Sequence, residues 1–159
     1  TPMKKDGSCD TSIVESVIAE ISQYGDCNCA VIKSTVPPGT TKRLHEKYIN
    51  GFHLWAVLHN SEFLTEANAI EDFKRQDRIL IGTPMQSRDN KIKDEHDILK
   101  FIYAKAYPEV PCVILDSTAE EMVKYTTNCF LAMKVSFNAM VKTRLQKLSA
   151  RLSIYNMVQ

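Results

Sequence analysis

Helical apolar patterns and short apolar runs alternate along the first two thirds of the chain. Over residues 13–21 the apolar positions recur at helical spacing, which predicts a helix capped by Asp10 or Thr11 and ended by Gly25. The segments that follow are expected to be a strand at 29–34, a helix at 40–49, strands at 52–59 and 77–82, a helix at 96–106 and a strand at 111–116. This order predicts an α/β fold with a parallel sheet and crossover helices.

The last third of the chain has a different pattern. Thr118 and Glu121 have the spacing of a capping box, and neither proline nor glycine occurs from there through Gln159. This predicts one long helix after the last strand.

Composition and charge narrow the function classes. The 159 residues are 44% apolar and 25% charged, with a formal net charge of +1, which is ordinary for a globular protein. The 20 basic residues are offset by 19 acidic ones, so we expect no nucleic-acid partner. No apolar run approaches the roughly 20 residues that span a bilayer, so we expect no membrane partner and a cytoplasmic protein. The five scattered cysteines predict reduced thiols and no metal site.

The segment STVPPGT, residues 34–40, forms a stiff polar corner directly after a predicted strand. Its two prolines fix φ, Gly39 permits an unusual backbone angle, and Thr40 or Thr41 can cap the next helix. The hydroxyls of Ser34 and Thr35 would then be held at the carboxyl end of a strand, where open α/β sheets bind ligands. The alternative is a plain turn between strand and helix.

Two carboxylates follow the next predicted strand in NSEFLTEANAIEDF, residues 60–73. Glu62 and Glu66 flank apolar Phe63 and Leu64, and a carboxylate beside apolar walls can serve as a base or orient a water molecule. The simpler interpretation is that the later acidic residues begin a helix.

Lys124 and Asn128 lie four residues apart in the predicted long helix and therefore share one face. An ammonium group and an amide placed together can stabilise a developing oxyanion. The alternative is a solvated helix face.

Taken together, these segments resemble the UDP-glucose/GDP-mannose dehydrogenase family. The matching stretches are VIKSTVPPGT, NSEFLTEANAIEDFKRQDRILIG and AEEMVKYTTNCFLAMKVSF, together with TPMKKDG at the start and LSIYNMVQ at the end. The resemblance implies a partial chain. Residues 1–116 would be the C-terminal half of a Rossmann-like NAD-binding domain, and residues 117–159 the start of the central helical dimerisation domain.

The resemblance also implies a reaction and its partners. These enzymes oxidise the C6 alcohol of a nucleotide sugar to a carboxylate in two NAD-dependent steps, through an aldehyde held by a cysteine thiol. The segment EFLTEANAIEDF favours UDP-glucose as the substrate. A homodimer through the C-terminal helix is expected.

Site residues are carried over from the family position by position. The implied catalytic residues are Thr35, Glu62, Lys124 and Asn128. The implied cofactor-binding residues are Thr1, Pro2, Ser34, Thr35 and Glu66. The implied substrate-binding residues are Glu62, Phe63, Leu64, Glu66, Lys124 and Asn128. In these roles Glu62 positions the hydrolytic water, while Lys124 and Asn128 steady the oxyanion and the sugar hydroxyls.

The sequence departs from the family pattern at two functional elements. No two glycines are close enough for the phosphate-binding G-x-G-x-x-G, and no cysteine lies in the glycine-rich setting of the family's nucleophile. The chain alone is therefore expected to be inactive. One hypothesis is a fragment of a UDP-glucose 6-dehydrogenase-like enzyme, and the other is an inactive homologue that serves as a dimerising or nucleotide-sugar-binding module.

Overall fold

A computed structural model describes residues 2–24, 27–49, 54–65, 67–84 and 90–157, of which the side chains at 90–94 and 149–157 are not included. The chain divides into two compact units, Thr1–Tyr125 and Thr126–Gln159. None of the helices in the described ranges combines the length and hydropathy that crossing a bilayer requires.

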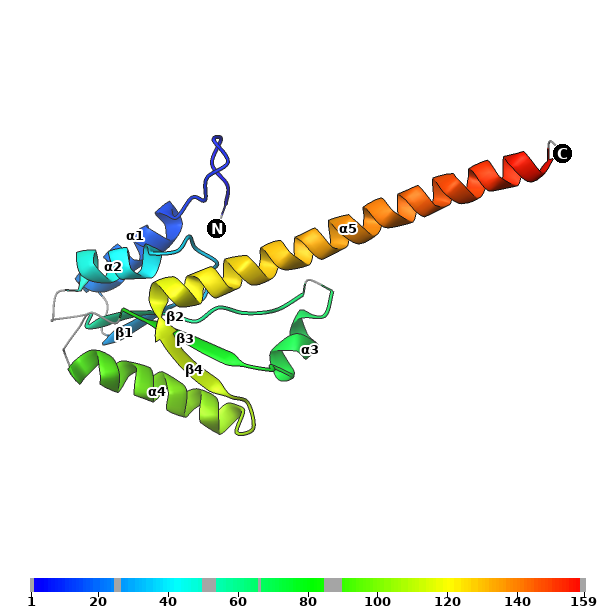
Figure 1. The fold of residues 1–159 in the computed structure, drawn as a ribbon. Helices are drawn as coiled ribbons and strands as arrows, with labels where there is room; N and C mark the ends of the chain where they lie inside the picture. Colours follow the sequence, from blue (N-terminus) through cyan, green and yellow to red (C-terminus); the bar gives the residue numbers. More distant parts are fainter. Residues whose placement is uncertain (1, 25–26, 50–53, 66, 85–89, 158–159) are drawn as a thin grey trace. The chain divides into compact units, whose positions relative to one another are not determined.

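The elements follow the predicted order (Figure 1). They are α1 (Ser12–Tyr24), β1 (Cys29–Ile32), α2 (Thr40–Tyr48), β2 (Ala56–His59), α3 (Ala69–Lys74), β3 (Ile79–Thr83), α4 (Asn90–Ala106), β4 (Cys112–Asp116) and α5 (Ser117–Met157). Each predicted helix and strand is therefore confirmed, with α4 beginning at Asn90 rather than at His96.

Among the described residues the strands form one sheet in the order β1-β2-β3-β4. β1 is parallel to β2, and β3 is parallel to β4. β2 and β3 are antiparallel and pair at His59 and Gly82. The α/β class is confirmed, but the prediction of a parallel sheet throughout is wrong at this pair.

The reversal follows from the segment between β2 and β3. A parallel return needs a crossover that runs back along the sheet, usually a helix. α3 has six residues, a rise of about 9 Å, which is too short for that path. The chain instead continues beyond β2, turns through α3 and returns as β3 (Figure 1). Consequently the carboxyl ends of β2 and β3 meet at His59 and Gly82.

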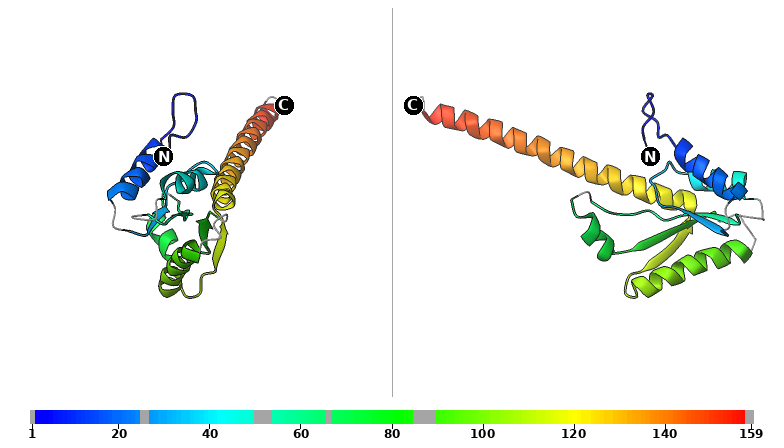
Figure 2. Two further views of the ribbon diagram at one scale, coloured as in Figure 1. Left: turned by 90° about the vertical axis from the view of Figure 1, so that its left-hand side faces the viewer. Right: turned by 180° about the vertical axis from the view of Figure 1, so that it is seen from behind.

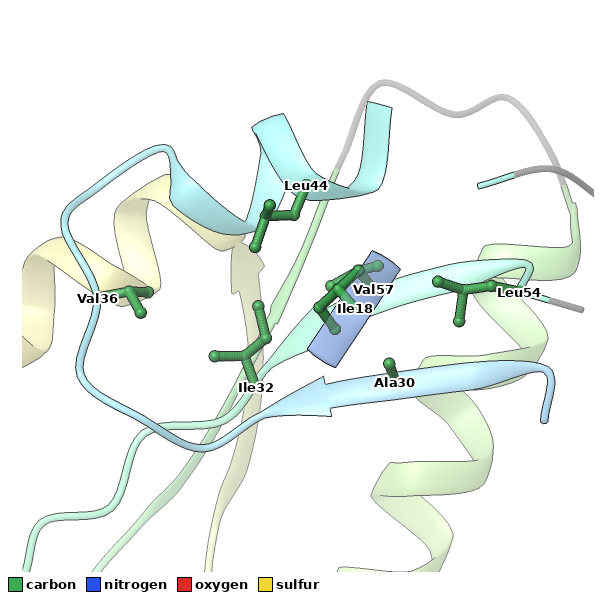
Figure 3. Packing of buried hydrophobic residues seen from close by; sticks show 7 residues of the cluster. All are labelled: Ile18, Ala30, Ile32, Val36, Leu44, Leu54 and Val57. Carbon is green, nitrogen blue, oxygen red and sulfur yellow. The ribbon is translucent and has the colours of Figure 1, made fainter. Parts of the chain in front are cut away.

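β1 and β2 bury side chains on both faces of the sheet. One face carries a cluster with residues of α1 and α2 (Figure 3), made of Ile18, Ala30, Ile32, Val36, Leu44, Leu54 and Val57. On the other face Ala56 and Leu58 pack with Val31 and with Leu99 of α4. Figure 2 shows α1 and α2 on one side of the sheet and α4 on the other. This alternation explains why the strands appear in the sequence as continuous apolar runs.

The start of α5 differs from the prediction. The Asp116 carboxylate accepts a hydrogen bond of 3.0 Å from the Thr118 amide, so Asp116 satisfies the first turn. The Glu121 carboxylate binds instead to the distant residues Gly39 and Thr41. The predicted capping box of Thr118 and Glu121 is therefore wrong, because Glu121 has better donors outside its own helix.

The second unit contains the rest of α5. Several large apolar side chains there are exposed and recur every three or four residues, which places them on one side of the helix. They are Phe130, Met133, Phe137, Val141, Leu145 and Leu148.

A three-way ion pair ties α1 to α2 in the first unit. Glu15 of α1 accepts hydrogen bonds from Arg43 at 2.9 Å, Lys47 at 2.7 Å and the Tyr48 hydroxyl at 3.1 Å. The Lys47 and Arg43 bonds lower the pKa of Glu15 from 4.5 to about 2.

The variant Glu15→Gln is expected to be less stable than the parent protein at pH 7, with a clearly smaller difference at pH 3 and none below about pH 2. Because the folded pKa lies below the unfolded one, the carboxylate stabilises the fold above pH 4.5 and loses this effect as the pH falls through about 2. The expected difference at pH 7 is ~2–4 °C in Tm, equivalent to ~1 kcal/mol. Thermal melts by circular dichroism measure it. Glu20→Gln on the exposed side of α1 is the control, and an equal effect at both pH values would contradict the prediction.

Candidate functional site

The candidate site lies where β1 and β2 end and α5 begins. The corner after β1 carries Ser34 and Thr35, and the segment after β2 carries Glu62 and Phe63. Lys124 comes from the first turns of α5 and belongs to the same compact unit. In the described part of the chain, the structure therefore brings together side chains that are far apart in the sequence.

Lys124 links α5 to the segment after β2. Its side chain is buried, with 9% of the residue's surface exposed, and its ammonium donates a hydrogen bond to the Glu62 carbonyl. The same ammonium lies 5.0 Å from the centre of the Phe63 ring, and the Arg78 guanidinium lies 4.6 Å from that centre. Burial lowers the pKa of Lys124, although Glu62 and Glu120 oppose this effect. A partly desolvated cation is thus held in place beside the predicted sugar-binding segment.

The Glu62 carboxylate contacts a second lysine. Lys33 Nζ lies 3.2 Å from Glu62 Oε1 and donates a hydrogen bond of 2.7 Å to the Asn60 side chain. The Tyr103 hydroxyl of α4 also donates to Asn60 Oδ1, and Asn60 Nδ2 donates to the Leu80 carbonyl at 2.6 Å. The main chain of Glu62 is therefore held by Lys124, and its carboxylate is held by Lys33.

A buried ion pair joins the two strand ends to α5. His59 Nδ1 bonds to Glu120 Oε2, and both side chains are fully buried. His59 Nε2 donates to the Ser34 carbonyl at 3.0 Å, and Glu120 Oε1 accepts from the Ser61 amide at 3.0 Å. Burial lowers the pKa of His59, but the bonds to Glu120 and Ser34 outweigh it, so the pKa of His59 is raised.

The neighbouring carboxylate of Glu121 binds the start of α2. It accepts from the Gly39 amide at 2.5 Å, and from the Thr41 amide and hydroxyl at 2.8 and 2.6 Å. Gly39 has φ of 89°, so the unusual backbone angle predicted there is confirmed. The predicted caps Thr40 and Thr41 do not bond to the helix's own amides, since the Thr40 hydroxyl donates to Pro37 O at 2.6 Å.

His59 and His45 are expected to titrate on opposite sides of the ordinary histidine pKa of 6.5. Burial lowers the pKa of His45, whose Nδ1 accepts from the Val57 amide at 3.2 Å. His59 thus stabilises the fold below pH 6.5 and loses this effect as the pH rises through its raised pKa. His45 does the opposite, losing its contribution as the pH falls through its lowered pKa. An NMR titration of the imidazole signals, assigned with His45→Gln, measures both, and the reverse order would contradict the structure.

The other predicted site residues have varied positions. Thr35 and Leu64 are half-buried, and the Ser34 side chain is exposed. Pro2 is exposed, and its carbonyl accepts from the Asp10 amide at 2.8 Å. Asn128 is exposed in the second unit. Thr1 and Glu66 lie outside the described residues.

Comparison with known sequences shows which protein family this chain is related to. Residues 1–106 match the NAD-binding domain of the UDP-glucose/GDP-mannose dehydrogenase family. The chain belongs to this family. A UDP-glucose 6-dehydrogenase of Rickettsia bellii is 38% identical over 139 residues, which are 86% of this chain and 30% of that protein. The resemblance inferred from the sequence is therefore confirmed, as is its extent as a partial match.

Solved structures of the UDP-glucose/GDP-mannose dehydrogenase family agree with the fold. A GDP-mannose dehydrogenase from Pseudomonas aeruginosa matches with a TM-score of 0.69 and 31% identity, over 86% of this chain and 32% of that one. A UDP-glucose dehydrogenase from the archaeon Pyrobaculum islandicum matches with a TM-score of 0.68 and 36% identity, over 86% of this chain and 31% of that one. The chain spans about a third of the length of these relatives.

Within this family member, sequence reasoning missed the residues that hold the candidate site together. They are Lys33, His59, Asn60, Tyr103, Glu120 and Glu121. His59 and Asn60 could have been found as polar residues at the end of a buried strand. Tyr103 gave no such signal, because its contact depends on the packing of α4.

Neither the start of α2 nor the cavity between α1 and β1 fits a pyrophosphate. A helix N-terminus can bind phosphate, but the first amides of α2 are bound to Glu121. A cavity of about 450 Å³ between α1 and β1 reaches Ser34, and its lining is aliphatic apart from Cys29, Lys33 and Ser34. No cluster of three metal-binding side chains occurs in the described ranges.

Proposed function

We propose that the chain forms part of an NAD-dependent dehydrogenase that oxidises a nucleotide sugar, of the UDP-glucose to UDP-glucuronate type. The observation that carries this proposal is Lys124, a buried cation fixed to the main chain of Glu62 and covered by Phe63. A cation in this environment attracts negative charge more strongly than one in water. It is therefore suited to the oxygen at the sugar C6, where charge develops during oxidation.

In this proposal each residue has a separate task. Lys124 and Asn128 stabilise the oxyanion and bind sugar hydroxyls, while Phe63 and Leu64 line the sugar site. Glu62 orients the water that releases the product. The ion pair with Lys33, at 3.2 Å, supports this role because it restrains the carboxylate. Glu66 would line both sugar and cofactor.

NAD, which accepts the hydride in such reactions, is proposed as a neighbour of Ser34 and Thr35. Thr1 and Pro2 would also border it. Because the start of α2 and the cavity beside β1 do not fit the pyrophosphate, no phosphate contact is assigned to either of them. The given sequence also holds neither G-x-G-x-x-G nor a cysteine in the family's setting. We therefore propose that this chain by itself is catalytically inactive and supplies part of a composite site.

The partner proposed for the chain is a second copy, joined through the C-terminal helix. The support is the exposed apolar series of the second unit, from Phe130 to Leu148. A helix with such a face gains stability when a like helix covers it.

Calorimetric titration of the chain with UDP-glucose tests the proposal. We expect binding that Lys124→Ala weakens about tenfold, equivalent to about 1.4 kcal/mol. Lys142→Ala, which removes an exposed lysine of the same helix, is the matched control and should leave the affinity within about twofold.

Parallel titrations identify the ligand class. GDP-mannose in place of UDP-glucose tests the choice of nucleotide sugar, and NAD tests the cofactor corner. No heat with any nucleotide sugar, from a chain whose circular dichroism shows it folded, would overturn the proposed binding. Binding without weakening by Lys124→Ala would overturn the role of Lys124.

A further inference from the structure

Two adjacent carboxylates at the start of α5 are fully buried and bind different loops. Glu121 accepts from Gly39 and Thr41 at the corner after β1. Glu120 accepts from His59 and from the Ser61 amide at the end of β2. One helical turn thus contacts both loops that carry the candidate site.

All four oxygens of these two carboxylates accept hydrogen bonds. Glu121 Oε2 binds one amide, and its Oε1 binds an amide and a hydroxyl. Glu120 Oε2 binds His59, and its Oε1 binds an amide. Carboxylates engaged in this way, and fully buried, are not exposed to a bound substrate, so they are suited to holding other groups in place.

The groups that they hold adjoin the candidate site residues. Through His59, Glu120 is connected to the Ser34 carbonyl, and through the Ser61 amide it is connected to the residue before Glu62. Glu121 fixes the end of the corner that begins with Ser34 and Thr35. Neither carboxylate has a hydrogen bond to the side chain of a predicted catalytic residue among the described contacts.

Burying two carboxylates only to dock α5 against the rest of the unit would be costly. Desolvating each ion costs several kcal/mol unless its oxygens find donors, and apolar residues of similar size would dock a helix as well or better. Directed hydrogen bonds, in contrast, fix the position and orientation of backbone amides. The arrangement therefore indicates that the two carboxylates fix the positions of backbone amides in the loops, rather than only docking α5.

We propose that Glu120 and Glu121 are positioning residues with separate targets in the two loops of the candidate site. Glu121 sets the Gly39–Thr41 end of the corner that would border the cofactor. Glu120 sets the segment that would bind the sugar and, through His59, also reaches the Ser34 carbonyl. The relevance to catalysis rests on the proposed function, whereas the placement of the loops does not.

Amide hydrogen exchange of the isotope-labelled chain, measured by NMR without ligand, tests the placement. Glu121→Gln keeps the side-chain shape and should speed exchange at the Gly39 and Thr41 amides about tenfold, with Ser61 changed less than twofold. Glu120→Gln should do the reverse. Equal acceleration at all three amides in either variant would overturn the proposal, because it would mean that α5 merely undocks as a unit.

A second variant guards against misfolding. If Glu121→Gln does not fold, Thr41→Val removes the hydroxyl donor to Glu121 while keeping the side-chain size. Its effect should be confined to the Gly39 and Thr41 amides, and a change at Ser61 would overturn the independence of the two loops.

Titration of the same variants with UDP-glucose then separates the two proposals. If the parent chain binds UDP-glucose, Glu120→Gln should weaken this binding more than Glu121→Gln does. Equal weakening of the binding by both variants would count against the assignment of separate loops. If the parent chain does not bind, the proposed function fails, yet the exchange pattern still decides the positioning roles.

Discussion

Truncating Glu120 to alanine is expected to lower the free energy of unfolding by about 3–5 kcal/mol. Glu120 and His59 are fully buried against each other, so the variant leaves a buried imidazole that is either charged without a counter-ion or neutral with Nδ1 unpaired. It also leaves the Ser61 amide without its acceptor. Urea denaturation at neutral pH, followed by circular dichroism, measures the loss.

The matched control for Glu120→Ala is Glu71→Ala. Glu71 is paired with Lys74 at 3.2 Å, but both side chains are largely exposed. Its removal should change the free energy of unfolding by less than about 0.5 kcal/mol. Combining Glu120→Met with His59→Leu should recover most of the loss, because no buried charge remains unpaired. A double variant as unstable as Glu120→Ala would contradict this explanation.

The second large effect is expected at Gly82, where the start of α5 packs tightly against the sheet. A Cβ atom on Gly82 would lie 3.0 Å from Ser117 Cα, 3.1 Å from Glu120 Cβ and 3.2 Å from His59 Cβ. Gly82→Ala should therefore destabilise the protein by about 1–3 kcal/mol, and Gly82→Val by more. The measurement is the urea midpoint.

Gly39→Ala provides the comparison for Gly82→Ala. A Cβ atom at Gly39 meets nothing within 4 Å, so its cost of about 1–2 kcal/mol comes only from φ of 89°. At Gly82, valine should therefore lower the free energy of unfolding much more than alanine does, because its added methyl groups enter the contact with α5 and His59. Equal effects of alanine and valine at Gly82 would show that the sheet and α5 separate easily.

Much of the fold was predictable because local patterns and packing agree. The run around Ala30 and Ile32 is apolar at every position, and the structure buries residues of β1 and β2 on both faces. The corner at Gly39 was predictable because few residues adopt a positive φ. The association of Lys124 with the Glu62 segment came from the family resemblance, since nothing in the sequence alone joins residues 62 positions apart.

The remaining features depend on tertiary contacts that a linear pattern does not contain. Glu121 has the spacing of a capping box, but the amides of Gly39 and Thr41 compete for its carboxylate and win. The direction of β3 depends on the path of the chain beyond Asn60, not on the composition of the strand. Glu120 resembles an ordinary acidic residue in the first turn of a helix until His59 is placed against it.

Within the described residues, the main chains of β2 and β3 pair only at His59 and Gly82, so the sheet consists of two parallel pairs joined at one seam. Each pair is connected through its own helix, α2 or α4, and aligns residues 27 positions apart (Cys29 with Ala56) or 33 positions apart (Ile79 with Cys112). Across the seam Leu99 of α4 packs against β2, and α5 adds the Glu121 contact with a residue 82 positions away. Closing so long a loop costs more entropy than closing either pair. We therefore expect the contact between Glu121 and the corner of the candidate site to form late in folding.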